Sequence, residues 1–178
     1  MAYGTLVKAD PVILGSGELY LGTVKADMTT EEKIDAALEN IGAIESGATL
    51  KYTPTFKEIE TANRGVIAKF ITKEEVVFNC GVMTWLLDNL ARLAPATVTK
   101  EDDKKVLKIG GKGSIPVNYL RFEHIKPDGK KLTVNIAKAV NNGGFEFTFD
   151  KENSTVINYE FSALAQEDGT LVEIIEEI

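Results

Sequence analysis

Residues 50–90 read LKYTPTFKEIETANRGVIAKFITKEEVVFNCGVMTWLLDNL, and this stretch is the most informative part of the chain. From residue 51 to residue 58 the side chains alternate with a period of two, which is typical of a β-strand. Residues 61–65, TANRG, predict a reversal, because Asn and Gly tolerate the positive φ that a tight turn needs. Residues 66–80 return in strand-like sequence, interrupted by Lys73-Glu74-Glu75. The stretch therefore predicts a long two-stranded hairpin.

The length of this hairpin predicts a role in assembly. Each arm has about ten or more residues, whereas strands usually have about five or six. Such an arm projects past its own core, and its unpaired edges invite another chain. Pro54 suits an edge strand. The alternative is that the hairpin folds back and its aromatic side chains complete the local core. We predict that the hairpin at residues 50–71 contacts another subunit through these residues: Tyr52, Pro54, Phe56, Glu58, Ile59, Glu60 and Arg64.

One amphipathic helix is expected after the hairpin, at about residues 82–94. Val82, Leu86, Leu90 and Leu93 fall on one stripe when spaced at about 100° per residue. Asn79 could cap its start, and Pro95 cannot continue it. Such a helix covers one face of a sheet.

The two segments ENIGAIESGATLKYTPTFKEIET (39–61) and NRGVIAKFITKEEVVFNCGVMTW (63–85) carry a family resemblance. In these segments the chain resembles the major tail (tail tube) proteins of long-tailed bacteriophages and related prophage particles. The resemblance covers roughly a third of the chain and rests on packing and turn residues. It implies a mainly β fold, a β-sandwich or barrel-like single domain over residues 1–178 with one flanking helix and the projecting hairpin.

The resemblance also implies a function and partners. It implies six copies per ring, with rings stacked into a tube through which DNA passes without specific binding. Tape measure, tail tip and tail terminator proteins are the implied partners, and the virion tail, assembled in the host cytoplasm, is the implied location. A tail terminator ring or a secretion-system tube protein could share the fold. We expect an acidic bore, with these candidates facing it: Glu146, Glu160 and Glu173.

The rest of the chain is predicted to consist of short strands joined by turns. A short helix is expected within residues 28–40, where Thr29 and Glu32 fit a capping box. Residues 115–126 and 131–140 form a predicted hairpin around Lys126-Pro127-Asp128-Gly129-Lys130. Further strands are expected at 12–14, 18–24, 106–109, 145–149, 155–165 and 170–178. Turn signals at this spacing favour a sandwich or barrel over parallel βαβ units.

Three segments are expected to be poorly ordered in an isolated subunit, because their backbone groups would find partners on neighbouring copies. They are the amino-terminal arm at residues 1–16, the hairpin around residues 53–64 and the carboxy-terminal segment at residues 170–178.

Composition and charge restrict the classes of function. The chain has 178 residues and a formal net charge of −7, which argues against tight binding to nucleic acid. Residues 139–178 hold nine acidic and one basic side chain, −8, whereas residues 100–138 hold ten basic and five acidic ones, +5. These regions are either two solvated surfaces or complementary patches between copies. We expect neither a membrane span nor a signal peptide. A single cysteine, Cys80, excludes an intrachain disulfide.

Catalytic and cofactor signatures fail when their spacing is compared with this sequence, so we expect no enzyme and no cofactor. Residues 110–114, GGKGS, lack the Walker spacing, and Gly15-Ser16-Gly17 lacks the third glycine of a dinucleotide fingerprint. His124 is the only histidine, which rules out a multi-histidine metal site. A Cys80–His124 pair stays open, although Cys80 ends an apolar strand. Two carboxylate pairs, Glu58 with Glu60 and Glu74 with Glu75, are interpreted as solvated.

Two classes of function remain. The first is a self-assembling structural protein, as the long hairpin and the family resemblance indicate. The second is a monomeric β-sandwich or barrel that binds a small ligand or a protein in the cytoplasm. Alternating strands are common to both classes.

Overall fold

The computed structural model describes residues 16–23, 25, 30–111 and 113–178, and these form a mainly antiparallel β structure. Their elements follow in chain order, with these bounds: β1 Glu18–Thr23, α1 Glu31–Ala37, β2 Glu39–Asn40, β3 Ile44–Thr61, β4 Gly65–Val82, α2 Leu87–Leu93, β5 Ala96–Glu101, β6 Lys104–Ile109, β7 Val117–Ile125, β8 Lys131–Asn141, β9 Ile157–Ala163 and β10 Glu173–Glu176. The mainly β prediction is confirmed. The predicted strand at residues 12–14 lies outside the described residues.

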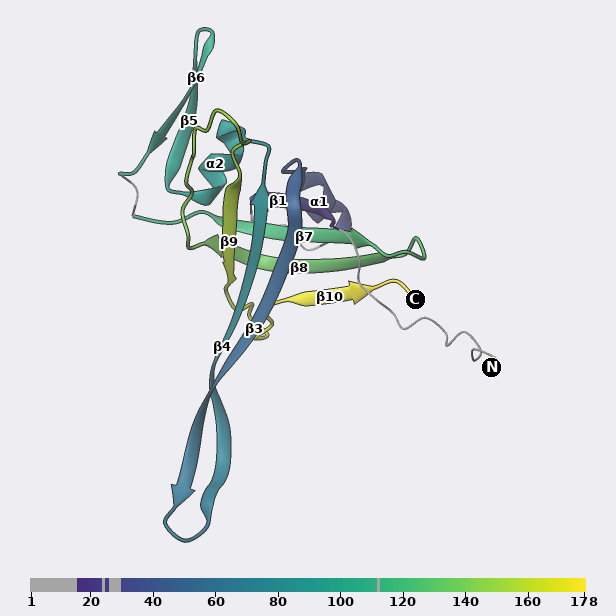
Figure 1. Ribbon diagram of the computed structural model, residues 1–178, viewed down its shortest axis with the longest axis vertical. Helices are drawn as coiled ribbons and strands as arrows, with labels where there is room; N and C mark the ends of the chain where they lie inside the picture. The colour runs from purple at the N-terminus through teal and green to yellow at the C-terminus, as the bar shows by residue number, and fades with distance from the viewer. Residues whose placement is uncertain (1–15, 24, 26–29, 112) are drawn as a thin grey trace.

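The described strands form one eight-stranded sheet and a separate two-stranded sheet. The path through the larger sheet is β2-β1-β7-β8-β9-β4-β3, and β10 pairs with β8 beside this path. β5 and β6 form the small sheet. In Figure 1, β7 and β8 run across the direction of β3, β4 and β9, so the large sheet bends back over itself. A bent sheet can enclose a core between its two halves, as the two layers of a sandwich do.

The core lies on the inner face of this bend. Alternate residues of β4 and β9 face it, and each strand supplies a large aromatic side chain, Phe78 and Phe161, that is almost fully buried. Leu120 of β7 and Ile136 of β8 pack from the crossing strands, and Leu90 of α2 contributes to the same cluster. Each such side chain contributes about 1.5–3 kcal/mol when fully buried, so this cluster is the main stabilising element of the body.

The flanking helix is shorter than predicted, and it begins later. Val82 is paired with Ile44 and Ile157 in the large sheet, and the Met83 N–H donates to the Ala43 carbonyl oxygen at 2.8 Å. Strand pairing therefore includes the first residue of the expected helix, α2 begins only at Leu87, and the prediction of a helix from residue 82 is wrong. The prediction that Asn79 caps the helix is also wrong, because Asn79 lies inside β4. Leu86 is the residue that precedes the helix.

Two helices occur among the described residues. The expected helix within residues 28–40 is confirmed as α1, whose N-cap is Thr30 without a side-chain hydrogen bond. The other half of the predicted capping box, Thr29, lies outside the described residues. No described residue of α1 is buried, so other contacts must hold this helix.

The predicted hairpin around residues 126–130 is confirmed, because β7 and β8 pair antiparallel over most of their length. The prediction of a strand at residues 145–149 is wrong. This part of the chain belongs to an irregular segment between β8 and β9, although Phe145 and Phe147 still pack partly against the core. Two of its polar groups bond locally, since the Thr155 hydroxyl donates to the Thr148 carbonyl oxygen.

Candidate assembly interface

The hairpin of β3 and β4 projects from the body of the molecule (Figure 1). The two strands pair from Ala48 with Cys80 out to Thr61 with Gly65. Only the inner end of β4, Val77–Val82, also pairs with β9. Beyond that end, the two arms of the hairpin have only each other as strand partners among the described residues. Gly65 closes the turn at a φ of +69°, a conformation that glycine adopts without strain.

Two register shifts modify the ladder within the projecting part. One lies between Thr55 and Phe56, and the other between Ile59 and Glu60. Each extra residue lies on β4, so the alternation along β3 is unbroken. Bulges of this kind bend and twist a two-stranded ribbon, and they set the direction in which the hairpin leaves the body.

The three apolar side chains predicted to contact another subunit are exposed on this hairpin. Tyr52 is 51% exposed, and Phe56 and Ile59 are each 43% exposed. The alternative in which these side chains complete the core of their own subunit is therefore wrong. Alternation places Tyr52 and Phe56 on one face of β3 and Ile59 on the other.

Sequence reasoning missed the contribution of the returning arm, where four more apolar side chains are exposed: Val66, Ile67, Phe70 and Ile71. Ile71 pairs with Phe56, and Phe70 pairs with Lys57, so the apolar surface covers both faces of the hairpin. The cross-strand register was needed to find this, because the bulges break simple alternation in β4. Exposed apolar surface on this scale marks an interaction site in soluble proteins.

Polar contacts hold the side chains of one hairpin face in place. The Tyr52 hydroxyl donates to Glu74 at 2.7 Å, and this bond, with the nearby carboxylate charge, raises the pKa of Tyr52. Lys69 forms an ion pair with Glu58 at 2.7 Å and lies 4.5 Å from the centre of the Phe56 ring. These contacts are exposed, so each contributes little to stability. Their effect is to fix the orientation of the aromatic rings.

The remaining predicted interface residues differ in how they are held. Pro54 lies opposite Glu74 in the ladder and is partly buried. Glu60 and Arg64 are exposed near the tip, and neither forms an ion pair with any residue that the structure describes. The outer edge of β3 is free as well, because β3 ends the strand order and pairs only with β4 among the described strands. A free edge of 18 residues offers a template for further pairing.

The three predicted bore residues are exposed but belong to three different segments. Glu146 lies in the irregular segment after β8, Glu160 on β9 and Glu173 on β10. Glu160 pairs with Asn79 of β4 on the sheet face that points away from the core. Glu173 pairs with Asn135 of β8.

The carboxy-terminal segment is attached to its own subunit, so the expectation that its backbone finds partners only on neighbouring copies is wrong. Glu173–Glu176 pair with Leu132–Asn135 of β8. Lys126 binds Glu176 at 2.9 Å, and Glu177 exchanges hydrogen bonds with the Lys131 backbone. The same correction applies to residues 53–64, which pair with β4. Of the amino-terminal arm, only Ser16 lies within the described residues.

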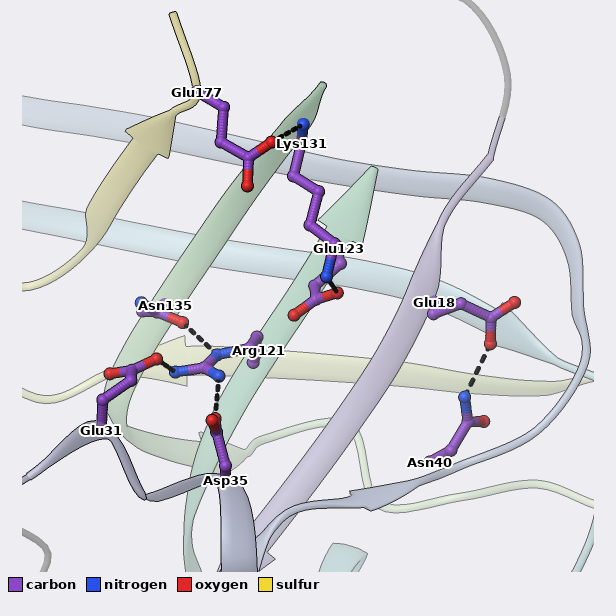
Figure 2. A network of polar contacts seen from close by, with 9 residues as sticks. All are labelled: Glu18, Glu31, Asp35, Asn40, Arg121, Glu123, Lys131, Asn135 and Glu177. Atoms are coloured by element: carbon purple, nitrogen blue, oxygen red, sulfur yellow. Dashed lines mark hydrogen bonds and ion pairs between the residues drawn. The ribbon is translucent and has the colours of Figure 1, made fainter. Parts of the chain in front are cut away.

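A polar network fixes α1 on the face of the sheet opposite the core. Figure 2 shows the Arg121 guanidinium between Glu31 and Asp35 of α1, with Asn135 of β8 accepting a hydrogen bond at 2.9 Å. Burial of Arg121 acts to lower its pKa, but the hydrogen bond with Asp35 and the charge of Glu31 outweigh this and raise the pKa. Lys131 binds Glu123 nearby at 2.8 Å. Arg121 is thus the residue that attaches a helix with no buried side chain of its own.

The cysteine and the histidine considered for catalysis lie on strands that are not adjacent in the sheet. Cys80 is buried on β4, and burial raises the pKa of its thiol to about 12, which keeps it protonated at neutral pH. His124 lies on β7, which β8 and β9 separate from β4 in the sheet, and its Nδ1 is 2.7 Å from the Ser16 carbonyl oxygen. A reactive cysteine needs a lowered pKa and a base beside it. Within the described residues, no group of three or more His, Cys, Asp or Glu side chains could hold a metal ion.

Among the described residues, no helix has both the length and the apolar character needed to cross a membrane.

Comparisons with known proteins gave one kind of match. No family model and no curated protein matches this chain. Among solved structures, the chain is similar to a chain in the cryo-electron microscopy structure of the anti-feeding prophage baseplate, symmetrised six-fold. The TM-score is 0.46 and the identity 10%, over 94% of this chain and 97% of that chain. A match at this level assigns neither fold nor function to this chain.

Proposed function

We propose that this protein is a structural subunit that assembles with copies of itself into stacked rings, forming the tail tube of a long-tailed phage or a prophage-derived particle. The observation that carries the proposal is the hairpin, which projects from the body and exposes apolar side chains on both faces. Burying an aromatic side chain of this kind contributes about 1.5–3 kcal/mol, so a monomer in water forgoes several such contributions. The resemblance in residues 39–85 supports the same assembly.

In the proposed assembly, the hairpin of one subunit lies against a neighbouring copy. Tyr52, Phe56 and Ile59 bury their apolar surface there, and Glu60 and Arg64 set the register. The free edge of β3 adds a second means of pairing between copies. Six subunits per ring, and contacts with tape measure, tail tip and tail terminator proteins, follow from the family resemblance as parts of the same proposal.

The bore of the proposed tube is acidic, so that DNA passes without adhering. Every phosphate that a wall lysine neutralised would add an electrostatic attachment. Glu160 and Glu173 are exposed on strands and keep their place as candidates for the wall, with Glu146 in the segment after β8. The proposed role of these residues is structural and needs neither a cofactor nor a chemical step, so we propose no enzymatic activity.

The direct test measures assembly as a function of concentration. We expect wild-type protein to sediment as a monomer or a loose oligomer when dilute, and to form rings and tubes in electron micrographs when concentrated. Phe56→Asp should remain folded but form no tubes at the concentrations at which wild type forms them, because it places a charge in the apolar contact. The matched control is Ile125→Asp, which puts the same charge at an exposed isoleucine of β7, outside the hairpin of β3 and β4.

The alternative function, a monomeric protein that binds a ligand, predicts a different result. Wild-type protein would then remain a monomer at every concentration, and micrographs would show no polymer. Tubes formed by Phe56→Asp as readily as by wild type would refute the role of the hairpin while leaving self-assembly standing.

A further inference from the structure

A second exposed aromatic surface lies at the other end of the molecule. It consists of Trp85 and Leu86, in the connection between β4 and α2, with Phe147 and Phe149 of the irregular segment; we call it the aromatic patch. Phe149 is 94% exposed, and Trp85 59% exposed. An isolated exposed aromatic side chain is unremarkable, but a contiguous group marks an interaction surface.

Ring contacts connect the patch. Phe147 is its centre, since its ring lies 6.2 Å from Trp85 in an edge-on arrangement and 6.2 Å from Phe149 in a stacked one. Phe145 approaches Phe147 from the core side at 5.3 Å. The patch is therefore anchored to the hydrophobic core by one ring and presents two others to solvent.

Local hydrogen bonds hold the segment that carries Phe149. The Asn141 side-chain amide donates to the Leu93 carbonyl oxygen of α2 at 2.8 Å and to the Gly144 carbonyl oxygen at 2.7 Å. The Asp150 carboxylate accepts from the Glu152 N–H and from the Asn153 amide, each at 2.8 Å. These bonds fix the chain on both sides of the exposed ring. The position of Phe149 is thus set before any partner binds, which lowers the entropic cost of binding.

Charge around the two apolar surfaces is of opposite sign. Residues 142–156 carry three acidic side chains and Lys151, a net charge of −2. The projecting part of the hairpin, residues 55–71, carries three basic and two acidic side chains, a net charge of +1. Lys57 and Arg64 form no ion pair with any described residue of their own subunit. Complementary charges of this kind select the partner and its register.

The placement of the two surfaces decides what kind of contact they can make. Figure 1 shows the hairpin at one end of the longest axis, whereas α2 and the trace between β8 and β9 lie toward the opposite end. A contact between two different surfaces of identical subunits is heterologous, and it repeats without closing when the surfaces lie at opposite ends. Such a contact adds subunits along the long axis.

We propose that the aromatic patch is the receiving surface for the hairpin of a second copy of this chain. Phe56, or its neighbours on the hairpin, packs against Phe149 and Trp85 of the next subunit along the axis, and Lys57 and Arg64 face the acidic side chains of residues 142–156. Glu146 then faces the partner hairpin instead of a bore. The inference rests on the proposed self-assembly and adds the surface that receives the hairpin.

The test uses two variants that each lack one of the two surfaces. Phe56→Asp lacks a functional hairpin, and Phe149→Asp lacks a functional patch. Because Phe149 is almost fully exposed, its substitution should leave the thermal midpoint of the monomer unchanged. Each variant alone should require a concentration roughly tenfold to a hundredfold higher than wild type for assembly, since one buried aromatic contact is lost. Ile125→Asp should assemble like wild type.

Mixing the two variants tests whether the hairpin and the aromatic patch bind each other. The intact hairpin of Phe149→Asp should bind the intact patch of Phe56→Asp. The resulting complex should contain one layer of each variant and grow no further, because only altered surfaces remain at its two ends. Assembly of Phe149→Asp at the wild-type concentration would overturn the inference while leaving the proposed function intact. Loss of assembly without any complex in the mixture would overturn the pairing of these two surfaces. A wild-type protein that never assembles would refute both.

Discussion

Individual side chains of this protein show where stability was not the only requirement. Phe149 and Trp85 are exposed although burying them would stabilise the monomer, and Tyr52 and Phe56 are exposed at the other end. Tyr159 shows the opposite compromise, because it is 1% exposed and its hydroxyl has no hydrogen-bond partner among the described residues. Burial raises the pKa of this hydroxyl, so the group stays protonated at neutral pH.

Removing the Tyr159 hydroxyl should stabilise the protein. A buried polar group without a partner costs about 1–3 kcal/mol, and Tyr159→Phe removes that cost while keeping the ring. We expect the free energy of unfolding, measured by urea denaturation, to rise by about 1 kcal/mol. Phe161→Tyr is the matched control, since it adds a hydroxyl to a fully buried ring of the same strand and should destabilise. A loss of stability in Tyr159→Phe would show that the hydroxyl has a partner.

Asp150 gives the aromatic patch a dependence on pH. Hydrogen bonds from the Asn153 amide and the Glu152 N–H hold the pKa of Asp150 below its ordinary value of 3.8. A lowered pKa means that the ordered segment binds the proton less well than the released segment does. The contribution of the Asp150 carboxylate to the stability of the ordered segment is therefore complete above pH 3.8, and it is lost as the pH falls through the lowered pKa.

Trp85 can report this change, because it is the only tryptophan and it contacts Phe147 of the same segment. We expect its fluorescence emission to be constant from neutral pH down to about pH 5 and to change only below the ordinary carboxyl pKa. Asp150→Asn should show the changed emission already at neutral pH. Identical emission of Asp150→Asn and wild type at neutral pH would show that these hydrogen bonds do not hold the segment.

Among the elements, the hairpin and α1 depend on the body in different ways. The hairpin is attached through the continuous strands β3 and β4, whereas α1 is attached through the polar contacts of one arginine. The projecting part of the hairpin, residues 55–71, and α1 both contribute little to the hydrophobic core. Each can therefore be altered without unfolding the body.

Shortening the hairpin should abolish assembly and leave the fold intact. Replacing residues 56–72 by Asn-Gly joins the paired residues Thr55 and Lys73 through a tight two-residue turn and retains all of β4 that pairs with β9. We expect near-ultraviolet circular dichroism and the thermal midpoint to stay close to those of wild type, while tubes are absent from micrographs. An unfolded product would show that the hairpin stabilises its own subunit.

Arg121→Met should release α1 selectively. The substitution keeps an apolar stem but removes the ion pairs with Glu31 and Asp35, which are both exposed and therefore stabilise little. It also leaves the buried Asn135 side chain without the hydrogen bond from Arg121, so the free energy of unfolding should fall by about 1–3 kcal/mol. Amide hydrogen exchange in Glu31–Ala37 should accelerate strongly, whereas exchange in β4 and β9 should change little. Equal acceleration in α1 and in the core strands would show that Arg121 stabilises the whole fold instead.

At the scale of the whole molecule, local sequence patterns predicted the strands better than the surfaces. Alternation and turn residues identified the hairpins of β3 with β4 and of β7 with β8, because both signals act over a few neighbouring residues. The helix was predicted to start too early, since the pairing of Val82 with Ile157 joins residues far apart in the sequence. The aromatic patch was not predicted at all, because Phe145, Phe147 and Phe149 have the alternation of a strand.

The molecule as a whole predicts how its assembly responds to salt. The two proposed surfaces bring together aromatic and aliphatic side chains, and their net charges of +1 and −2 are small. At about 0.5 M NaCl, charges more than roughly 5 Å apart are largely screened, whereas apolar burial is not weakened. The concentration needed for assembly should therefore rise by less than about tenfold between roughly 0.05 and 0.5 M NaCl, and ammonium sulfate should lower it.

Sedimentation of wild type against Lys57→Gln measures how much of the association free energy is electrostatic. Because that variant removes one of the cations that face the acidic segment, its assembly should depend still less on NaCl. Dissolution of wild-type polymers by moderate NaCl would mean that charge, and not the aromatic surfaces, holds the copies together.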